Sequence, residues 1–373
     1  MSSRVSEKAP RPLRSGFTTG ACAAAAARGA ALMLRAQQRV EQVDIRLPAG
    51  FTATFALHGQ QVSPTTASCF VIKDAGDDPD VTHGAEIHAE VSLSPSTEAI
   101  RICGGPGIGR VTKPGLAVAV GEWAINPVPR RMIAEAVLEV FPPGADALRP
   151  MVTLSIPDGA RRAEQTLNAR LGILGGLSIL GTTGVVRPIS HQAWTDTLEV
   201  ALDVARAAGC AQVVLSTGRS SEQAAQGALP LQAEAFIMMG DFAAHALEAC
   251  HRKGFPGIVL AAQFAKLVKI ACGHDHTHVR NSRLDLAQLA TWARALDLDG
   301  GLIKKIEFAN TAREVFSELD ASHLLVDEVA RRALAWIGRR APGADAGLLL
   351  VDYSGQAVRR FGSSWLFAQG TAP

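Results

Sequence analysis

The sequence is poor in aromatic side chains and in net charge. Its 373 residues include 13 Phe, 5 Trp and a single Tyr, and 37 Lys and Arg against 35 Asp and Glu leave a formal net charge of +2. A near-neutral balance argues against a protein built to bind phosphate backbones, and so few aromatic rings leave little surface for stacking on bases. We therefore expect no nucleic-acid partner.

Paired cysteines and long apolar runs are missing as well. No two of the six cysteines stand in a Cys-x-x-Cys spacing, so we expect reduced thiols in a cytoplasmic protein. The alanine run 23–27 is interrupted by Arg28, and no segment approaches the ~20 uninterrupted apolar residues of a membrane span. The sequence also lacks the Gly-x-Ser-x-Gly elbow of many hydrolases and the lysine-containing P-loop. The prediction is a protein that is neither exported nor inserted in a membrane.

What the sequence does contain is material for a large core, with 47% hydrophobic residues and 35 glycines. Length and composition predict a globular protein of two domains that handles small molecules. In residues 1–165, the alanines of 19–35 predict a helix that Thr18 or Thr19 can cap. Segments of alternating polar and apolar residues predict strands over 43–47, 52–57, 66–72, 86–93, 98–103 and 152–156. With a helix over 125–141, this half is predicted to be an α+β domain.

The pattern changes over residues 166–373. Short apolar runs alternate with amphipathic helical segments, which is typical of a parallel sheet with helices on both faces. Three runs end in small polar turns, at 181–184 (Gly-Thr-Thr-Gly), 216–218 (Ser-Thr-Gly) and 240–241 (Gly-Asp). Ligands bind outside the carboxyl ends of such strands, so the turns predict a shared site, with Asp241 as a candidate for binding ribose hydroxyls. The alternative is that these are ordinary turns whose Thr and Asp cap helices.

Two further segments allow more than one interpretation. His274, Asp275, His276 and His278 stand within five residues, which suggests a metal-dependent hydrolase. No second cluster of ligands accompanies them in the sequence, so we predict no metal bound by the protein. The glycine-rich, basic stretch 104–115 could meet an acidic ligand, or could be a solvated hairpin.

Several uncommon strings, taken in order, resemble one family. They are Ser-Gly-Phe-Thr-Thr-Gly-Ala-Cys-Ala-Ala-Ala at 15–25, Gly-Ile-Gly-Arg-Val-Thr-Lys-Pro-Gly-Leu at 107–116, Ala-Ile-Asn-Pro-Val-Pro-Arg at 124–130, Asn-Ala-Arg-Leu-Gly-Ile-Leu-Gly-Gly-Leu-Ser-Ile-Leu-Gly-Thr-Thr-Gly at 168–184, Gly-Asp-Phe at 240–242 and Lys-Leu-Val-Lys at 266–269. As a set they resemble the cobalt-precorrin-5B C(1)-methyltransferases, the CbiD family of anaerobic cobalamin synthesis. The sequence departs from the family pattern at Trp123, at 261–265 and at His276.

The resemblance implies a fold and a reaction. It implies an α+β domain over 1–165 and a Rossmann-like, three-layer α/β domain over 166–373, with the site in the cleft between them. S-adenosylmethionine would donate a methyl group to ring carbon 1 of cobalt-precorrin-5B, giving cobalt-precorrin-6A, and cobalt would arrive only within that tetrapyrrole substrate. A non-catalytic tetrapyrrole carrier is the other alternative, and association with further copies of the chain stays open.

The resemblance also suggests roles for individual residues. Thr18 and Thr19, in the most distinctive string, are expected to face the substrate, and Asp241 to act with them. The methyl donor is expected to lie across Gly175, Gly176, Gly181, Thr182, Thr183, Gly184, Thr217 and Gly218. Because the tetrapyrrole carries several carboxylates, its rim is expected to be anchored by Arg110, Lys113, Arg130, Lys266 and Lys269. The alternative for each of these cations is a solvated surface charge.

Overall fold

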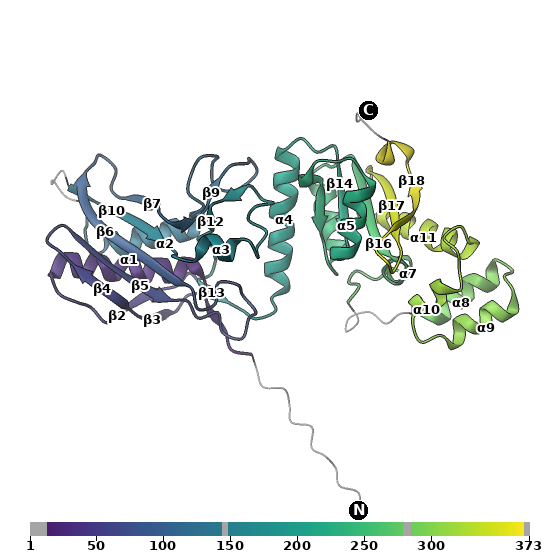
Figure 1. Ribbon diagram of the computed structural model, residues 1–373, viewed down its shortest axis with the longest axis horizontal. Helices are drawn as coiled ribbons and strands as arrows, with labels where there is room; N and C mark the ends of the chain where they lie inside the picture. The colour runs from purple at the N-terminus through teal and green to yellow at the C-terminus, as the bar shows by residue number, and fades with distance from the viewer. Residues whose placement is uncertain (1–12, 144–147, 279–284, 369–373) are drawn as a thin grey trace, which may run out of the picture. The chain divides into compact units, whose positions relative to one another are not determined.

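The structure is a computed structural model that describes residues 13–143, 148–278 and 285–368. The chain forms two compact units, one ending at Ser190 and the other beginning at His191 (Figure 1). Both units mix helices with sheets. No helix in the described ranges is long and apolar enough to cross a membrane.

The first unit is built on a five-stranded sheet with the order β4-β5-β6-β10-β7. Neighbouring strands are antiparallel except for β10 and β7, which run parallel. These strands are β4 (His58–Val62), β5 (Thr66–Ile72), β6 (Glu86–Pro95), β7 (Arg101–Gly104) and β10 (Leu148–Ser155). A separate hairpin pairs β2 (Gln42–Arg46) with β3 (Thr52–Ala56).

Helix α1 (Thr19–Ala36) is the centre of this unit, where it packs against β5, β6 and helix α2 (Pro127–Leu138). Residues 21–27, six alanines and Cys22, are all at most 1% exposed. Alanine favours the helix and lets neighbouring backbones approach closely, so a helix this small in cross-section is buried on all sides. The helix predicted over 19–35 is confirmed. A short helix, α3 (Gly159–Ala163), follows β10.

Three pairs of two-residue strands complete the first unit. They are β1 (Gly16–Phe17) with β13 (Val185–Val186), β8 (Gly107–Ile108) with β12 (Gly176–Leu177), and β9 (Arg110–Val111) with β11 (Ile173–Leu174). The expectation that 171–180 forms a strand of the C-terminal parallel sheet is wrong, because this segment pairs with β8 and β9. For the same reason the chain divides after Ser190 rather than after residue 165.

The second unit contains a five-stranded sheet with the order β15-β14-β16-β17-β18, of which the first four strands are parallel and β18 is antiparallel. The strands are β14 (Gln212–Ser216), β15 (Phe236–Met238), β16 (Gly257–Gln263), β17 (Asp345–Val351) and β18 (Ala357–Gly362). Every residue of β14 is buried, which is typical of a strand covered on both faces.

Helices cover both faces of this sheet. Val213 and Leu215 face a large core shared with α4 (His191–Ala207), α6 (Ala243–Arg252), α7 (Phe264–Ala271) and α11 (Leu324–Arg340). Val214 faces a smaller core shared with α5 (Arg219–Ala228) and the 3-10 turn η2 (Ser364–Phe367). The remaining helical elements are η1 (Ala233–Ala235), α8 (Leu286–Ala295), α9 (Gly300–Phe308) and α10 (Ala312–Ser317). The second unit is thus a three-layer α/β arrangement.

Candidate functional site

The N-terminal motif of the first unit lies between two other segments. Phe17 N donates to Asp74 O (2.7 Å), Thr18 N to Gly184 O (3.1 Å) and Gly20 N to Leu180 O (3.0 Å). The motifs at 107–111 and 173–177 meet through the two strand pairs β8–β12 and β9–β11. Three motifs that are far apart in the sequence therefore come together within one unit.

Thr18 and Thr19 are both buried at the start of α1. Thr18 Oγ1 accepts a hydrogen bond from Ala21 N (3.2 Å) and so caps the helix. Thr19 Oγ1 accepts from Leu180 N (2.9 Å) and lies 3.3 Å from the carbonyl oxygens of Ser178 and Leu180. Both hydroxyls therefore help to hold the motif together.

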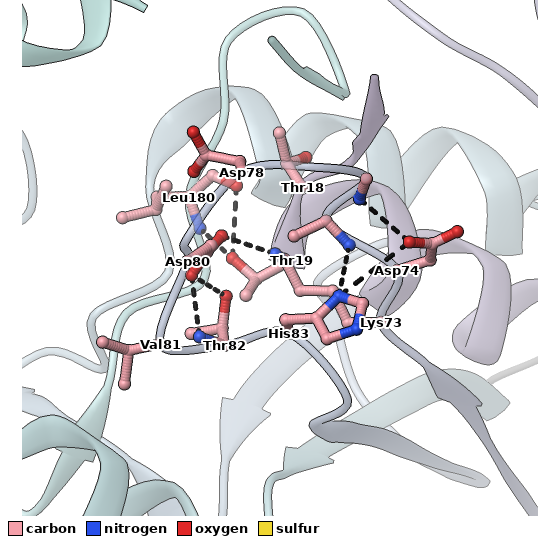
Figure 2. Close-up of polar contacts among 12 residues, drawn as sticks. Thr18, Thr19, Lys73, Asp74, Asp78, Asp80, Val81, Thr82, His83 and Leu180 are labelled. Carbon is pink, nitrogen blue, oxygen red and sulfur yellow. Dashed lines mark hydrogen bonds and ion pairs between the residues drawn. The ribbon is translucent and has the colours of Figure 1, made fainter. Parts of the chain in front are cut away.

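A buried ion pair lies beside these threonines (Figure 2). The Lys73 side chain is 1% exposed, and its Nζ donates to Asp80 Oδ2 at 2.6 Å. Asp80 Oδ1 accepts from Thr82 N (2.7 Å) and Thr82 Oγ1 (2.6 Å). Burial alone would raise the pKa of Asp80, but the charge of Lys73 and these hydrogen bonds outweigh it and hold the pKa below its usual range. The carboxylate is therefore charged at neutral pH.

The same loop makes other polar contacts with distant segments. Asp74 pairs with Arg14, whose hydrogen bond is the main reason that the pKa of Asp74 falls to about 2. Asp78 Oδ1 accepts from Ile189 N at 3.0 Å. Ala75 N donates to His83 Nδ1 at 3.1 Å. The loop 73–84 is thereby fixed against both ends of the first unit's chain.

Three of the glycines predicted to hold the methyl donor are packed closely against other residues, Gly176 against backbone and Gly181 and Gly184 against side chains. A Cβ on Gly176 would lie 2.2 Å from Gly107 O, and one on Gly181 would lie 2.5 Å from Thr18 Cβ. Gly184 packs against Leu47, whereas Gly175 has open space where a Cβ would be. Close strand approach explains Gly176 without a ligand, and the Thr18 side chain explains Gly181.

The 181–184 turn was expected to end a strand of the parallel sheet, but it does not. It belongs to the first unit, and the next helix, α4, begins only at His191. Thr182 and Thr183 are exposed, and Thr183 Oγ1 lies 3.2 Å from Val185 O. The predicted donor residues consequently divide into two groups: Gly175 to Gly184 in the first unit, and Thr217 and Gly218 in the second.

The basic residues predicted in the first unit each contact other residues of that unit. The Arg110 guanidinium lies 3.9 Å from the Trp123 ring centroid and donates to Gly121 O at 2.6 Å. Arg130 Nη1 donates to Ile102 O at 3.4 Å. The side chain of Lys113 packs on Gly172, where a Cβ would meet it at 2.4 Å. Each cation thus has a structural role, whatever else it binds.

In the second unit, the predicted strand ends do come together. Ser216 O accepts from Met239 N (2.9 Å) and Gly240 N (3.3 Å), and Thr217 N donates to Ala261 O (3.2 Å). The turns after β14 and β15 therefore lie side by side. This arrangement brings the Thr217-Gly218 turn next to the Gly240-Asp241 turn at one edge of the sheet.

Asp241 is the centre of a hydrogen-bonded cluster at that edge. Its Oδ1 accepts from Lys266 Nζ (2.5 Å) and Thr277 Oγ1 (2.7 Å). Thr277 is fully buried, and its backbone N donates to Asp241 O (3.0 Å). Burial would raise the pKa of Asp241, but the hydrogen bonds from Lys266 and Thr277, with the charges of Lys266 and His278, lower it overall. Asp241 is therefore an ionised, half-buried acceptor.

Lys269 does not lie where a substrate rim could reach it easily. Its side chain is buried, and Nζ donates to Thr277 O at 2.8 Å. Burial lowers the pKa of Lys269, and the neighbouring charge of Lys266 lowers it further. Lys269 supports the Asp241 cluster through the main-chain oxygen of Thr277, and a role as substrate anchor stays a prediction at this position.

The histidine-rich segment contacts other parts of the second unit. Asp275 pairs with Arg340, and the His276 ring lies against Phe242 (5.2 Å between centroids) and His191 (6.2 Å). Among the described residues, no three His, Cys, Asp or Glu side chains are grouped so that they could hold a metal ion. The segment therefore supports the Asp241 cluster through Thr277 and packs against Phe242 through His276.

Comparison with known proteins gives consistent matches. The CbiD family model matches residues 6–188, and the model of the CbiD C-terminal domain matches residues 276–360. The cobalt-precorrin-5B C(1)-methyltransferase of Pelobacter propionicus is 55% identical over 93% of this chain and 95% of its own length. The chain belongs to the CbiD family. The corresponding proteins of Geobacter sp. strain M21 and Priestia megaterium are 53% and 44% identical, over 93% and 94% of this chain and 98% of each relative.

One solved structure of a CbiD protein also matches. The cobalamin biosynthesis protein (cbiD) from Archaeoglobus fulgidus is 28% identical, with a TM-score of 0.38 over 77% of this chain and 85% of that protein. The first CbiD family model ends at residue 188, close to the division of the structure at Ser190. Family and structure thus agree that the 168–184 motif belongs with the N-terminal part.

Some residues of this CbiD chain that now stand out were missed in the sequence analysis. Lys73 and Asp80 flank a segment with four aspartates over 74–80, and that local excess of acid beside a lysine was the available signal. Thr277 stands within the histidine-rich segment 274–278, where only the His and Asp side chains were considered as ligands. Ser216 was considered only as part of a turn.

Proposed function

We propose that this chain transfers a methyl group from S-adenosylmethionine to carbon 1 of cobalt-precorrin-5B, giving cobalt-precorrin-6A in cobalamin biosynthesis. The observation that carries the proposal is the 52–55% identity, over more than nine-tenths of the chain, to relatives named cobalt-precorrin-5B C(1)-methyltransferase. The cobalt belongs to the tetrapyrrole substrate. We place the enzyme in the cytoplasm.

The second unit fits a nucleoside-containing donor. With β14 counted as the first strand, the sheet order is 2-1-3-4-5, a doubly wound, Rossmann-like arrangement that binds ligands outside the carboxyl ends of its central strands. Asp241 follows β15, the edge strand that pairs with β14. Both of its described side-chain hydrogen bonds reach Oδ1, so Oδ2 is left as an acceptor for ribose hydroxyls. An ionised carboxylate held by Lys266 and Thr277 is suited to accept them.

S-adenosylmethionine, when bound, supplies a methyl carbon already activated by its sulfonium sulfur. The tasks left to the protein are to orient donor and acceptor and to exclude water, and these need no nucleophilic side chain. Lys266 and Thr277 fix the position of the Asp241 carboxylate. In the first unit, Arg110 and Arg130 each keep further N–H donors that can bind carboxylates of the tetrapyrrole. No general base is assigned.

The two alternatives are less well supported. A metal-dependent hydrolase centred on His274, His276 and His278 does not explain the identity to named methyltransferases, and Asp275 and His276 are committed to Arg340 and Phe242. A non-catalytic carrier would bind the tetrapyrrole without consuming a methyl donor. Formation of S-adenosylhomocysteine therefore separates the carrier from the enzyme.

The donor site is tested by calorimetric titration of the full chain with S-adenosylhomocysteine. The substitution Asp241→Asn should weaken binding about tenfold, because it removes the charge that strengthens hydrogen bonds from the ribose. The matched control is Asp320→Asn, since the Asp320 carboxylate also accepts from a hydroxyl, that of Ser322, but is exposed and lies outside the Asp241 cluster. Unchanged affinity in Asp241→Asn would show that Asp241 does not bind the donor. If the unaltered chain does not bind S-adenosylhomocysteine, the proposal of S-adenosylmethionine as donor is contradicted.

A further inference from the structure

The start of helix α5 leaves backbone donors without acceptors. In α1 the corresponding groups are used, because Gly20 N donates to Leu180 O and Ala21 N to Thr18 Oγ1. In α5, the backbone N–H groups of residues 218–221 have no acceptor among the described residues, and the first hydrogen bond runs from Glu222 N to Gly218 O. A free row of N–H groups at a helix start attracts anions.

A buried hydroxyl at the same place also lacks a partner. Ser216 is 0% exposed, and its Oγ forms no hydrogen bond with any described residue. Side chains alternate along a strand, so Ser216 points to the same face of β14 as Val214. That face is the one covered by α5, because Val214 and Ala225 share a core there. The unused hydroxyl is therefore on the side of the sheet where the unused N–H groups begin.

Gly218, between Ser216 and the helix, has no structural requirement to be glycine. Its backbone is extended, with φ 177° and ψ 175°, which any residue adopts. A Cβ there would meet no described atom within 4 Å. Open space above a row of N–H groups is what close approach of a ligand needs.

Two charged side chains, Arg219 and Glu222, lie near this turn. Arg219 is exposed, and its side chain pairs with no residue in the described ranges. Glu222, one turn into the helix, is buried. At the turn itself, the N–H groups and the helix dipole favour a compact anion.

We propose that the start of α5 binds the α-carboxylate of the methyl donor, with the N–H groups of 218–221 and the Ser216 hydroxyl as its donors. This rests on the proposed function, in which Asp241 in the neighbouring turn binds the ribose of the same molecule. A carboxylate is also carried by the tetrapyrrole, and both sources present the same chemistry to this turn. The donor is favoured because Gly240 N bonds to Ser216 O and so joins the two turns.

The test compares two ligands that differ in the amino-acid end. S-adenosylhomocysteine carries the α-amine and the α-carboxylate, whereas 5′-methylthioadenosine keeps the nucleoside and sulfur but lacks both. Titrated into the full chain, Gly218→Val should lower affinity for S-adenosylhomocysteine at least about tenfold and leave 5′-methylthioadenosine unchanged. Ser216→Ala, which only removes a hydroxyl, should act in the same direction and about threefold. Gly227→Ala is the matched control, because this glycine of α5 also has open space around a Cβ.

The outcomes separate this inference from the proposed function. Equal losses for both ligands, or no loss in either variant with an unchanged thermal midpoint, would overturn the carboxylate assignment. A loss confined to binding of a polycarboxylate tetrapyrrole, with uroporphyrin as the probe, would assign the turn to the acceptor and also overturn it. Failure of the unaltered chain to bind S-adenosylhomocysteine at all would contradict the proposed function instead.

Discussion

The buried pair of Lys73 and Asp80 gives the most quantitative prediction about the first unit. Asp80→Asn keeps the size of the side chain and can keep both hydrogen bonds from Thr82, but leaves the ammonium group of Lys73, 1% exposed, without its counter-charge. Removing one partner of a buried pair costs about 3–5 kcal/mol. Because the Asp80 side chain is still 24% exposed, water offsets part of this, and we expect about 3 kcal/mol.

The assay is thermal unfolding of the full chain, followed together with hydrogen exchange of peptides from β5 and β6. For a unit of this size, about 3 kcal/mol corresponds to a fall of about 6–12 °C in the unfolding midpoint of the first unit. Lys73→Met added to Asp80→Asn should recover most of the loss, since a buried pair can be replaced by apolar and neutral groups at little cost. Glu135→Gln, which breaks the exposed pair with Arg131, is the matched control and should change stability by less than about 0.5 kcal/mol.

The pH dependence of this difference has a definite sign. The pKa of Asp80 is lower in the folded chain, so its stabilising contribution is present above the unfolded value and is lost as the pH falls through the folded one. The gap in stability between the unaltered chain and Asp80→Asn should be constant from about pH 8 to 5 and close below about pH 4. A midpoint in Asp80→Asn within 2 °C of the control, or a double variant less stable than Asp80→Asn, would refute the reasoning.

Three further predictions concern other parts of the chain. Lys266→Met should raise the pKa of Asp241. As the pH is lowered, affinity for S-adenosylhomocysteine should then begin to fall at a higher pH than in the unaltered chain. If calorimetry gives the same dependence of affinity on pH for both proteins, the proposed interaction of Lys266 with Asp241 is contradicted. Gly176→Ala, whose Cβ would lie 2.2 Å from Gly107 O, should destabilise the first unit by more than about 3 kcal/mol. Gly175→Ala is the control and should cost only about 1–2 kcal/mol of backbone strain. Equal unfolding midpoints for the two variants would show that the strand contact at Gly176 is not tight. Dialysis against a chelator should change neither the unfolding midpoint nor binding of S-adenosylhomocysteine, whereas a stoichiometric zinc, iron or manganese found by elemental analysis would restore the hydrolase alternative.

Local patterns were enough to predict the elements whose surroundings are uniform. The alanine-rich helix α1 and the continuously apolar strand β14 were predicted because their local composition already indicates that both are buried. Asp241 was identified as a strand-end residue for the same reason, since Gly240 and Asp241 directly follow the apolar run that forms β15.

The segment 171–180 shows where such reasoning stops. A short apolar run with glycines reads the same whether it joins a parallel sheet or pairs with a distant loop, and the partner decides. Here the partner is the segment 107–111, more than sixty residues away, where glycine at 107 and 176 permits backbones to touch. The burial of Lys73, Thr277 and Lys269 could not be predicted from the sequence either, because each is paired with a residue that only the fold brings near.

The central claim is methyl transfer to the tetrapyrrole, and one measurement tests it directly. The purified chain is incubated with cobalt-precorrin-5B and S-adenosylmethionine carrying a deuterated methyl group, and both products are followed by mass spectrometry. The account predicts a tetrapyrrole that has gained one deuterated methyl group, with an equal amount of S-adenosylhomocysteine. Binding of both compounds without either product would contradict it and leave a carrier in its place.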